Sequence, residues 1–206
     1  MVKSSKAWLQ RHVTDAYVRR AKAEGYRSRA AYKLLEIDQK DKILRPGIKV
    51  LDLGAAPGGW SQVAGRNVGP RGRVVAIDLL QTAPISGVVV LRGDVREPQA
   101  RAAARKALGG AVDVVLSDLS PNLSGIPAVD QARAAELAQF ALELACELLK
   151  PSGTLLVKVF QGEAFEELRS EMRRVFQAVL VRKPDASRGE SRETYLLGRN
   201  PKSALE

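Results

Sequence analysis

The stretch "KVLDLGAAPGGW" at residues 49–60 joins an apolar run to a glycine-rich turn. Its first five residues are typical of a buried strand, and Gly54, Gly58 and Gly59 allow a tight turn that lies close to a bound ligand. Residues 59–67 have the pattern of a helix, whose N-terminal amides would face the same ligand. This strand–turn–helix unit predicts a nucleotide-like cofactor at the edge of a parallel sheet.

Short apolar runs alternate with helical stretches through the rest of the chain. This alternation is typical of a mostly parallel sheet with helices on both faces. We predict a doubly wound, Rossmann-like α/β fold with seven strands, in a single domain that covers residues 1–206. Besides residues 49–53, the expected strands are 73–79, 88–94, 112–118, 154–160, 178–183 and 193–198, and the expected further helices are 96–108, 129–149 and 163–175.

Composition excludes several classes of protein. The chain has no run of about 20 apolar residues, and its N-terminus "MVKSSKAWLQRH" lacks the apolar segment of a signal peptide, so we expect a soluble, cytoplasmic protein. The one histidine, His12, and the one cysteine, Cys146, cannot assemble the usual zinc sites or a Ser-His-Asp nucleophile. We therefore expect no metal, and we expect Cys146 to pack in the core because it lies in an apolar helical pattern.

Positive charge is concentrated at the N-terminus. The chain has a net charge of +10, and residues 1–45 hold twelve Lys or Arg against five acidic residues. Trp8, Tyr17, Tyr26 and Tyr32 are interleaved with these cations. A solvated basic helix face could have the same composition, but cations with aromatic residues suit a surface that binds phosphates and stacks on bases. We predict a basic, RNA-binding N-terminal extension at about residues 1–45.

Acidic residues follow the first three expected strands. Asp52 lies just before the glycine turn, where it would repel a pyrophosphate but suit the amino group of a zwitterionic cofactor, so S-adenosylmethionine is favoured over NAD. Asp78 lies 24 residues after Gly54, a distance typical of an acid that binds ribose hydroxyls, and Asp94 is expected to face the adenine amine. One Asp after a strand is most often a helix cap, but three at successive strand ends favour a cofactor site.

The last two strand ends of this series carry Asp118 and Lys158. Asp118 lies beside the presumed methyl donor, and the displaced Pro121 with no following aromatic residue disfavours methylation of a base amine. Cys146 lies in the wrong setting for methylation of a pyrimidine carbon, which leaves an oxygen as the methyl acceptor. Lys158, in the apolar stretch "GTLLVKVFQG", either extends to solvent or faces the cleft of Asp118, and the pattern leaves both alternatives open.

Five blocks of the sequence together resemble one known family. "SRAAYKLLEID", "VLDLGAAPGGWSQV", "VVLSDLSPNLSG", "LLVKVFQG" and "SRETYLL", spread over residues 28–198, resemble the FtsJ family of S-adenosylmethionine-dependent ribosomal RNA 2'-O-ribose methyltransferases. The resemblance implies a Lys-Asp-Lys-Glu catalytic tetrad made of Lys33, Asp118, Lys158 and Glu193. It also implies cofactor contacts from Gly58, Trp60, Asp78, Asp94 and Asp118, to which the pattern of the turn adds Asp52 and Gly54.

The resemblance also implies a reaction and a substrate. A ribose 2'-hydroxyl would attack the sulfonium methyl group in line while Lys158 accepts its proton, with no metal. The implied substrate is a uridine in 23S ribosomal RNA, in the A-loop of the assembled large subunit, and the enzyme is expected to be a monomer. Two alternatives stay open: methylation of a ribose in the transfer RNA anticodon loop, and a non-catalytic RNA-binding factor for ribosome assembly.

Overall fold

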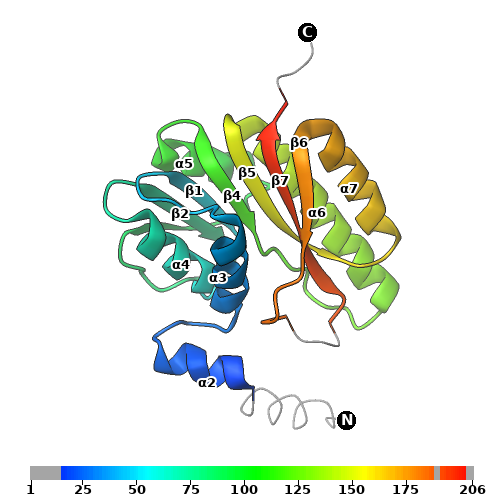
Figure 1. The fold of residues 1–206 in the computed structure, drawn as a ribbon, viewed down its shortest axis with the longest axis horizontal. Coiled ribbons are helices and arrows are strands. Elements are labelled where there is room, and N and C mark those ends of the chain that lie inside the picture. The colour runs from blue at the N-terminus through cyan, green and yellow to red at the C-terminus, as the bar shows by residue number, and fades with distance from the viewer. Residues whose placement is uncertain (1–14, 188–190, 203–206) are drawn as a thin grey trace.

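The computed structural model describes residues 15–187 and 191–202, and its central feature is a seven-stranded sheet in the order β3-β2-β1-β4-β5-β7-β6 (Figure 1). The strands from β1 to β5 are parallel, and β7 runs antiparallel to both of its neighbours, β5 and β6. The predicted Rossmann-like, mostly parallel fold is therefore confirmed. The strands are β1 Lys49–Leu53, β2 Arg73–Asp78, β3 Val88–Arg92, β4 Val112–Ser117, β5 Leu149–Phe160, β6 Phe176–Arg182 and β7 Glu193–Pro201.

Helices cover both faces of the sheet and enclose two apolar cores. One core lies against α5, α6 and α7, and the other lies against α3 and α4. Strand β5 contributes to both, because Leu155 and Val157 face the first core and Leu156 faces the second. The same alternation directs Lys158 to the side of α3 and α4. The helices are α2 Ala16–Ala23, α3 Ala30–Asp41, α4 Gly59–Val68, α5 Pro98–Leu108, α6 Pro127–Leu148 and α7 Glu163–Val175.

Two details differ from the predictions. Strand β5 begins at Leu149 and not at residue 154, because Leu149 already pairs with Val112 before an irregularity in the register. Cys146 is exposed, so the prediction that it packs in the core is wrong. Its neighbours Leu144 and Ala145 occupy the buried face of α6, and Cys146 lies outside that face.

Part of the basic N-terminal extension lies outside the described residues, including Trp8. In the described part, Tyr17 and Tyr26 pack against Tyr32, with ring centroids 5.5 and 5.7 Å apart, and Tyr32 is buried. The Tyr32 ring is therefore not available to stack on a base. Cations remain on the surface of α2, where Arg19, Arg20 and Lys22 are exposed.

None of the helices within residues 15–187 and 191–202 is long and apolar enough to cross a membrane.

Candidate active site

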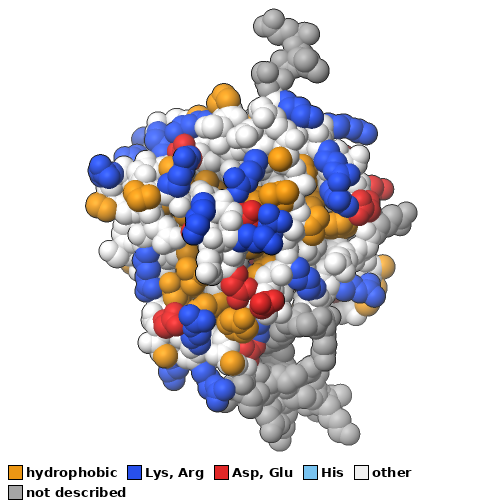
Figure 2. All heavy atoms as spheres, viewed as in Figure 1, with side chains coloured by type: hydrophobic (Ala, Val, Ile, Leu, Met, Phe, Trp, Pro, Cys, Tyr) orange, Lys and Arg blue, Asp and Glu red, His pale blue; other side chains and the backbone are white. Residues whose placement is uncertain are grey.

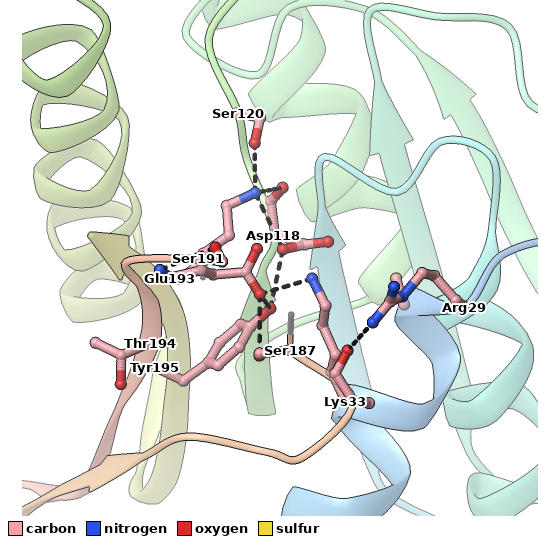
Figure 3. A network of polar contacts seen from close by, with 12 residues as sticks. Arg29, Lys33, Asp118, Ser120, Ser187, Ser191, Glu193, Thr194 and Tyr195 are labelled. Carbon is pink, nitrogen blue, oxygen red and sulfur yellow. Dashed lines mark hydrogen bonds and ion pairs between the residues drawn. The ribbon is translucent and has the colours of Figure 1, made fainter. Parts of the chain in front are cut away.

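Four charged side chains from distant parts of the chain meet at the carboxyl ends of the central strands (Figure 3). Lys33 comes from α3, Asp118 follows β4, Lys158 lies in β5 and Glu193 begins β7. Lys33 Nζ lies 2.6 Å from Glu193 Oε1, and Lys158 Nζ lies 3.1 Å from Asp118 Oδ1. The residues that the family resemblance implies as a tetrad thus form two neighbouring ion pairs.

Strand register explains why these side chains meet. In the parallel pairing of β4 with β5, Ser117 lies opposite Val157, so the next residues, Asp118 and Lys158, lie side by side. In the antiparallel pairing of β5 with β7, Lys158 lies opposite Tyr195. Opposite residues of a ladder share a face of the sheet, so the Tyr195 side chain is directed to the same site.

Lys158 is buried, with only 7% of its surface exposed. Besides its ion pair with Asp118, its Nζ donates to the backbone oxygen of Asp118 at 2.9 Å and to Ser120 Oγ. The amine therefore does not extend to solvent. Of the two alternatives for this lysine, the structure supports the one in which it faces the cleft of Asp118.

Glu193 accepts several hydrogen bonds through one oxygen. Its Oε1 accepts from Tyr195 Oη at 2.8 Å and from Ser187 Oγ at 3.3 Å, in addition to the Lys33 ion pair. Burial acts to raise the pKa of Glu193, but Lys33, Tyr195 and Lys158 together lower it below its ordinary value. Glu193 is therefore an ionised carboxylate at neutral pH, despite its burial.

The glycine turn after β1 brings backbone segments close together. Gly54 has φ +73°, and a Cβ there would lie 2.9 Å from the backbone of Leu119, so the turn and the loop after β4 are in direct contact. Gly58 has φ +115°, and a Cβ there would lie 2.6 Å from Ile85. The Arg27 guanidinium fixes the rim of this turn by donating to the backbone oxygens of Pro57, Ala83 and Pro84.

Asp52 lies behind this turn and is fully buried. Its Oδ2 accepts from Ser61 Oγ at 2.5 Å, while its Oδ1 has no hydrogen-bond partner. Burial raises the pKa of Asp52 to about 7, and the charges of Asp118 and Asp78 add to this effect. Asp52 therefore lies beneath the turn and not on its surface, and its contact with the amino group of a cofactor stays a prediction. Its visible role is to anchor Ser61, in α4.

The next two acids of the series remain at the carboxyl edge of the sheet. Asp78 accepts from the backbone nitrogens of Ala56, in the turn, and Leu80. Asp94 pairs with Arg96 at 2.6 Å, which holds the pKa of Asp94 below its ordinary value. Asp78 is thus bound to the glycine turn, whereas Asp94 follows the neighbouring strand β3 and is held by Arg96.

Trp60 is buried inside the protein, with 3% of its surface exposed. Its indole nitrogen donates to the backbone oxygen of Ala30 at 2.8 Å, and its ring lies 5.6 Å from that of Tyr195. The ring thus joins α3 to β7, and any contact of Trp60 with a cofactor would come from its backbone. Among the residues that the structure describes, no group of His, Cys, Asp and Glu side chains is arranged to hold a metal ion.

A family model described as FtsJ-like methyltransferase matches residues 26–201, a range that contains both ion pairs and the glycine turn. The chain belongs to the FtsJ-like methyltransferase family. It is therefore an enzyme that transfers a methyl group from a donor.

Individual relatives match this methyltransferase over most of their length. Ribosomal RNA large subunit methyltransferase E of Thiobacillus denitrificans is 56% identical over 200 residues, covering 97% of this chain and 91% of the relative. The protein of the same name from Azoarcus sp. is 57% identical over 197 residues, covering 95% and 96%. A crystal structure from Plasmodium falciparum, assigned as a ribosomal RNA methyltransferase, has a TM-score of 0.76 and 29% identity, covering 85% of this chain and 98% of that one.

Three side chains that shape the site of this methyltransferase were not predicted from the sequence. Tyr195 Oη bridges Glu193 Oε1 and, at 3.4 Å, Asp118 Oδ1, so it links the two ion pairs. Burial, with the charges of Asp118 and Glu193, raises the pKa of Tyr195 well above its ordinary value, so the hydroxyl remains a donor. Its spacing of two residues from Glu193 in a strand was the available signal. Ser120 and Arg27 had no comparable signal.

Proposed function

We propose that this methyltransferase transfers a methyl group from S-adenosylmethionine to a ribose 2'-oxygen of 23S ribosomal RNA. The observation that carries the proposal is the convergence of Lys33, Asp118, Lys158 and Glu193 into two buried ion pairs beside the glycine turn. A hydroxyl must lose its proton when it is methylated, and these are the groups able to receive it. The names of the relatives support large-subunit ribosomal RNA as the substrate.

The described residues fit a nucleoside cofactor with a cationic centre. Gly54 and Gly58 allow the tight turn that packs against the loop after β4 and against Ile85, and Asp78 and Asp94 would offer carboxylates to ribose hydroxyls and the adenine amine. Asp118 would lie near the methyl end. When bound, S-adenosylmethionine supplies a methyl group that is already activated by a sulfonium. The family implies a methyl donor, and the acidic character of this edge favours a cationic one.

In the proposed mechanism, Lys158 accepts the proton of the 2'-hydroxyl as the hydroxyl attacks the methyl carbon. Lysine amines are ordinarily protonated at neutral pH, so the site must make the neutral amine available. Asp118 binds Lys158 and Glu193 binds Lys33, so the two carboxylates orient the two amines in the site.

The proposed RNA-binding surface continues from the site onto α2. Ala21 of α2 packs with Ala186, and the neighbouring residue Ser187 contacts Glu193. Lys and Arg side chains are spread over the face shown in Figure 2. This continuity supports the proposal that residues 1–45 form a basic, RNA-binding extension. We also propose, from the sequence, that the protein is a single methyltransferase domain, a monomer and cytoplasmic. The resemblance favours a uridine in the A-loop of the assembled subunit as the target.

One experiment tests the reaction and the substrate together. The protein is incubated with labelled S-adenosylmethionine and either large ribosomal subunits or transfer RNA, and linkages resistant to alkali are mapped. Methylation of a 2'-oxygen removes the nucleophile of alkaline cleavage, so a new resistant linkage in 23S RNA supports the proposal. Label in transfer RNA alone would favour the anticodon-loop alternative, and absence of label in both would favour a non-catalytic RNA-binding factor.

The mechanism has its own test in Lys158→Ala. This variant should lose methylation while its affinity for S-adenosylmethionine, measured by calorimetry, stays within about threefold of the original, because Lys158 acts on the hydroxyl and not on the donor. Turnover of this variant at the original rate would remove Lys158 from the mechanism.

A further inference from the structure

The amine of Lys158 has one hydrogen-bond acceptor for each of the three hydrogens of an ammonium group. These acceptors are Asp118 Oδ1 at 3.1 Å, the backbone oxygen of Asp118 at 2.9 Å, and Ser120 Oγ. The cage therefore suits the protonated lysine. A lysine that accepts a proton during the reaction must first be neutral, with two hydrogens and one lone pair.

The three partners differ in what they can do when the amine becomes neutral. A carboxylate oxygen and a backbone carbonyl only accept hydrogen bonds, whereas the hydroxyl of Ser120 can also donate. The other polar groups around this amine are Glu193 and Tyr195 from β7 and Lys33 from α3, and Lys33 is held by Glu193. Ser120 is thus the one direct partner of Lys158 within the described residues that suits both protonation states of the amine.

We propose that Ser120 is a positioning residue for proton transfer at Lys158. The Ser120 hydroxyl accepts a hydrogen bond from the ammonium form of Lys158, and it turns away, or donates, when the amine is neutral. The two contacts with Asp118 keep the amine in place throughout. The third direction, occupied by Ser120 in the ammonium state, is then the direction from which the ribose 2'-hydroxyl approaches the lone pair. This inference rests on the proposed role of Lys158 as proton acceptor.

The reaction is balanced at these atoms. The neutral amine of Lys158 takes the proton of the 2'-hydroxyl, the ribose oxygen forms a bond to the methyl carbon, and the carbon–sulfur bond breaks with its electron pair left on sulfur. The positive charge passes from sulfur to the lysine, whose new third hydrogen needs an acceptor. Ser120 supplies that acceptor until the proton leaves for solvent.

The position of Ser120 is coupled to the glycine turn. Ser120 follows Leu119, whose backbone lies against Gly54, and the Asp118 nitrogen donates to the Leu53 oxygen at 3.1 Å. The segment that carries Ser120 is therefore held by the end of β1, where the methyl donor is proposed to bind. A ligand at the turn would act on the loop that positions the third acceptor of Lys158.

The test is the pH dependence of methyl transfer in Ser120→Ala. Without its third acceptor the ammonium is less stable, so the acid limb of the rate profile should move to lower pH by about one unit, which corresponds to a change of about tenfold in the protonation equilibrium. Rates are measured in single turnovers at saturating S-adenosylmethionine and large subunits between about pH 6 and pH 9. The proposed approach of the ribose hydroxyl from this direction would place RNA over the exposed side of Ser120, which would limit replacement of its hydroxyl by water.

Two further variants separate proton handling from structure. Ser120→Thr keeps a hydroxyl and should restore the original profile. Ser124→Ala removes another hydroxyl of the same loop, one that contacts Asp130 and not Lys158. This variant should leave the acid limb of the rate profile unchanged. Because Ser120 is exposed, the alanine variant should fold, which is checked by its affinity for S-adenosylhomocysteine.

The outcomes distinguish this inference from the proposed function. Coincident acid limbs for Ser120→Ala and the original protein, or a lower rate at every pH with no shift, would overturn the role of Ser120 while methylation of 23S RNA stands. A shift reproduced by Ser124→Ala would also overturn it, because the effect would then belong to the loop. Methylation that persists in Lys158→Ala would instead remove the proposed mechanism on which the inference rests.

Discussion

Replacement of Asp52 by Asn should make this protein less stable than the original at low pH and more stable than the original at high pH. Asp52 is fully buried, with one oxygen bound to Ser61 and the other without a partner. Its pKa of about 7 lies well above the ordinary value of an aspartic acid because burial disfavours the charge. Asn is neutral at every pH and can still accept the hydrogen bond from Ser61. The variant therefore removes the titration and keeps the contact.

The magnitude follows from the difference between the two pKa values. A raised carboxyl pKa means that the folded protein holds the proton more tightly than the unfolded chain does. As pH rises from about 4 to about 7, the unfolded chain ionises first, and the folded state loses about 1.4 kcal/mol per pH unit, or about 4 kcal/mol in all. The Asn variant avoids this loss. Its NH2 group, however, takes the place of the oxygen that has no partner, and leaving these hydrogens without an acceptor costs about 1–3 kcal/mol of folding free energy at every pH.

The assay is urea unfolding of both proteins between about pH 4 and pH 8. The variant should be the less stable protein near pH 4 and the more stable one at pH 8, because the other ionisable groups are common to both. A control is Asp130→Asn: the backbone nitrogen and hydroxyl of Ser124 lower the pKa of Asp130, so its contribution to stability is present at neutral pH and is lost as pH falls. The difference for that variant should have the opposite sign. A difference for Asp52→Asn that does not change with pH would refute the reasoning.

Two other substitutions test the RNA surface and the link between the ion pairs. Replacing Arg19, Arg20 and Lys22 by Ala should weaken binding to large subunits. Because each cation that contacts a phosphate releases a counterion, the slope of log affinity against log salt should flatten by up to about three units. An unchanged slope in filter binding would mean that the RNA binds another surface. Tyr195→Phe removes the hydroxyl that joins Glu193 to Asp118. It should slow methyl transfer by about tenfold in single turnovers and leave the affinity for the methyl donor unchanged. An unaltered rate would show that this hydroxyl is dispensable.

Much of the fold was predictable because apolar runs and strand ends are local features. Each expected strand and helix is present, and the carboxyl ends of the parallel strands meet at one edge as expected. The start of β5 was not predictable, since Leu149 joins the sheet through a distant partner, Val112. The exposure of Cys146 was missed because an apolar helix such as α6 does not reveal from sequence alone which of its apolar residues face solvent.

The site was predictable only in part. The positions of Asp118 and Lys158 followed from the topology of a parallel sheet, whereas Lys33 and Glu193 were identified only through the family resemblance. The contact of Asp52 with the cofactor stays a prediction, and the sequence did not reveal its burial against α4, where Ser61 binds it, because both faces of β1 are covered. Alternation along β7 could have identified Tyr195, which lies two residues after Glu193.

The arrangement of the two ion pairs has a consequence for the whole reaction. The proposed mechanism requires a neutral Lys158 before the reaction. With Lys33 paired with Glu193, the carboxylate of Asp118 would then give the cluster one net negative charge, which would attract a cationic methyl donor. After transfer the positive charge would lie on Lys158 and the sulfur product would be neutral, so the loss of this attraction would favour release of the product. Tyr195, bonded to both carboxylates, keeps the two pairs close enough for this exchange of charge to act on a single site.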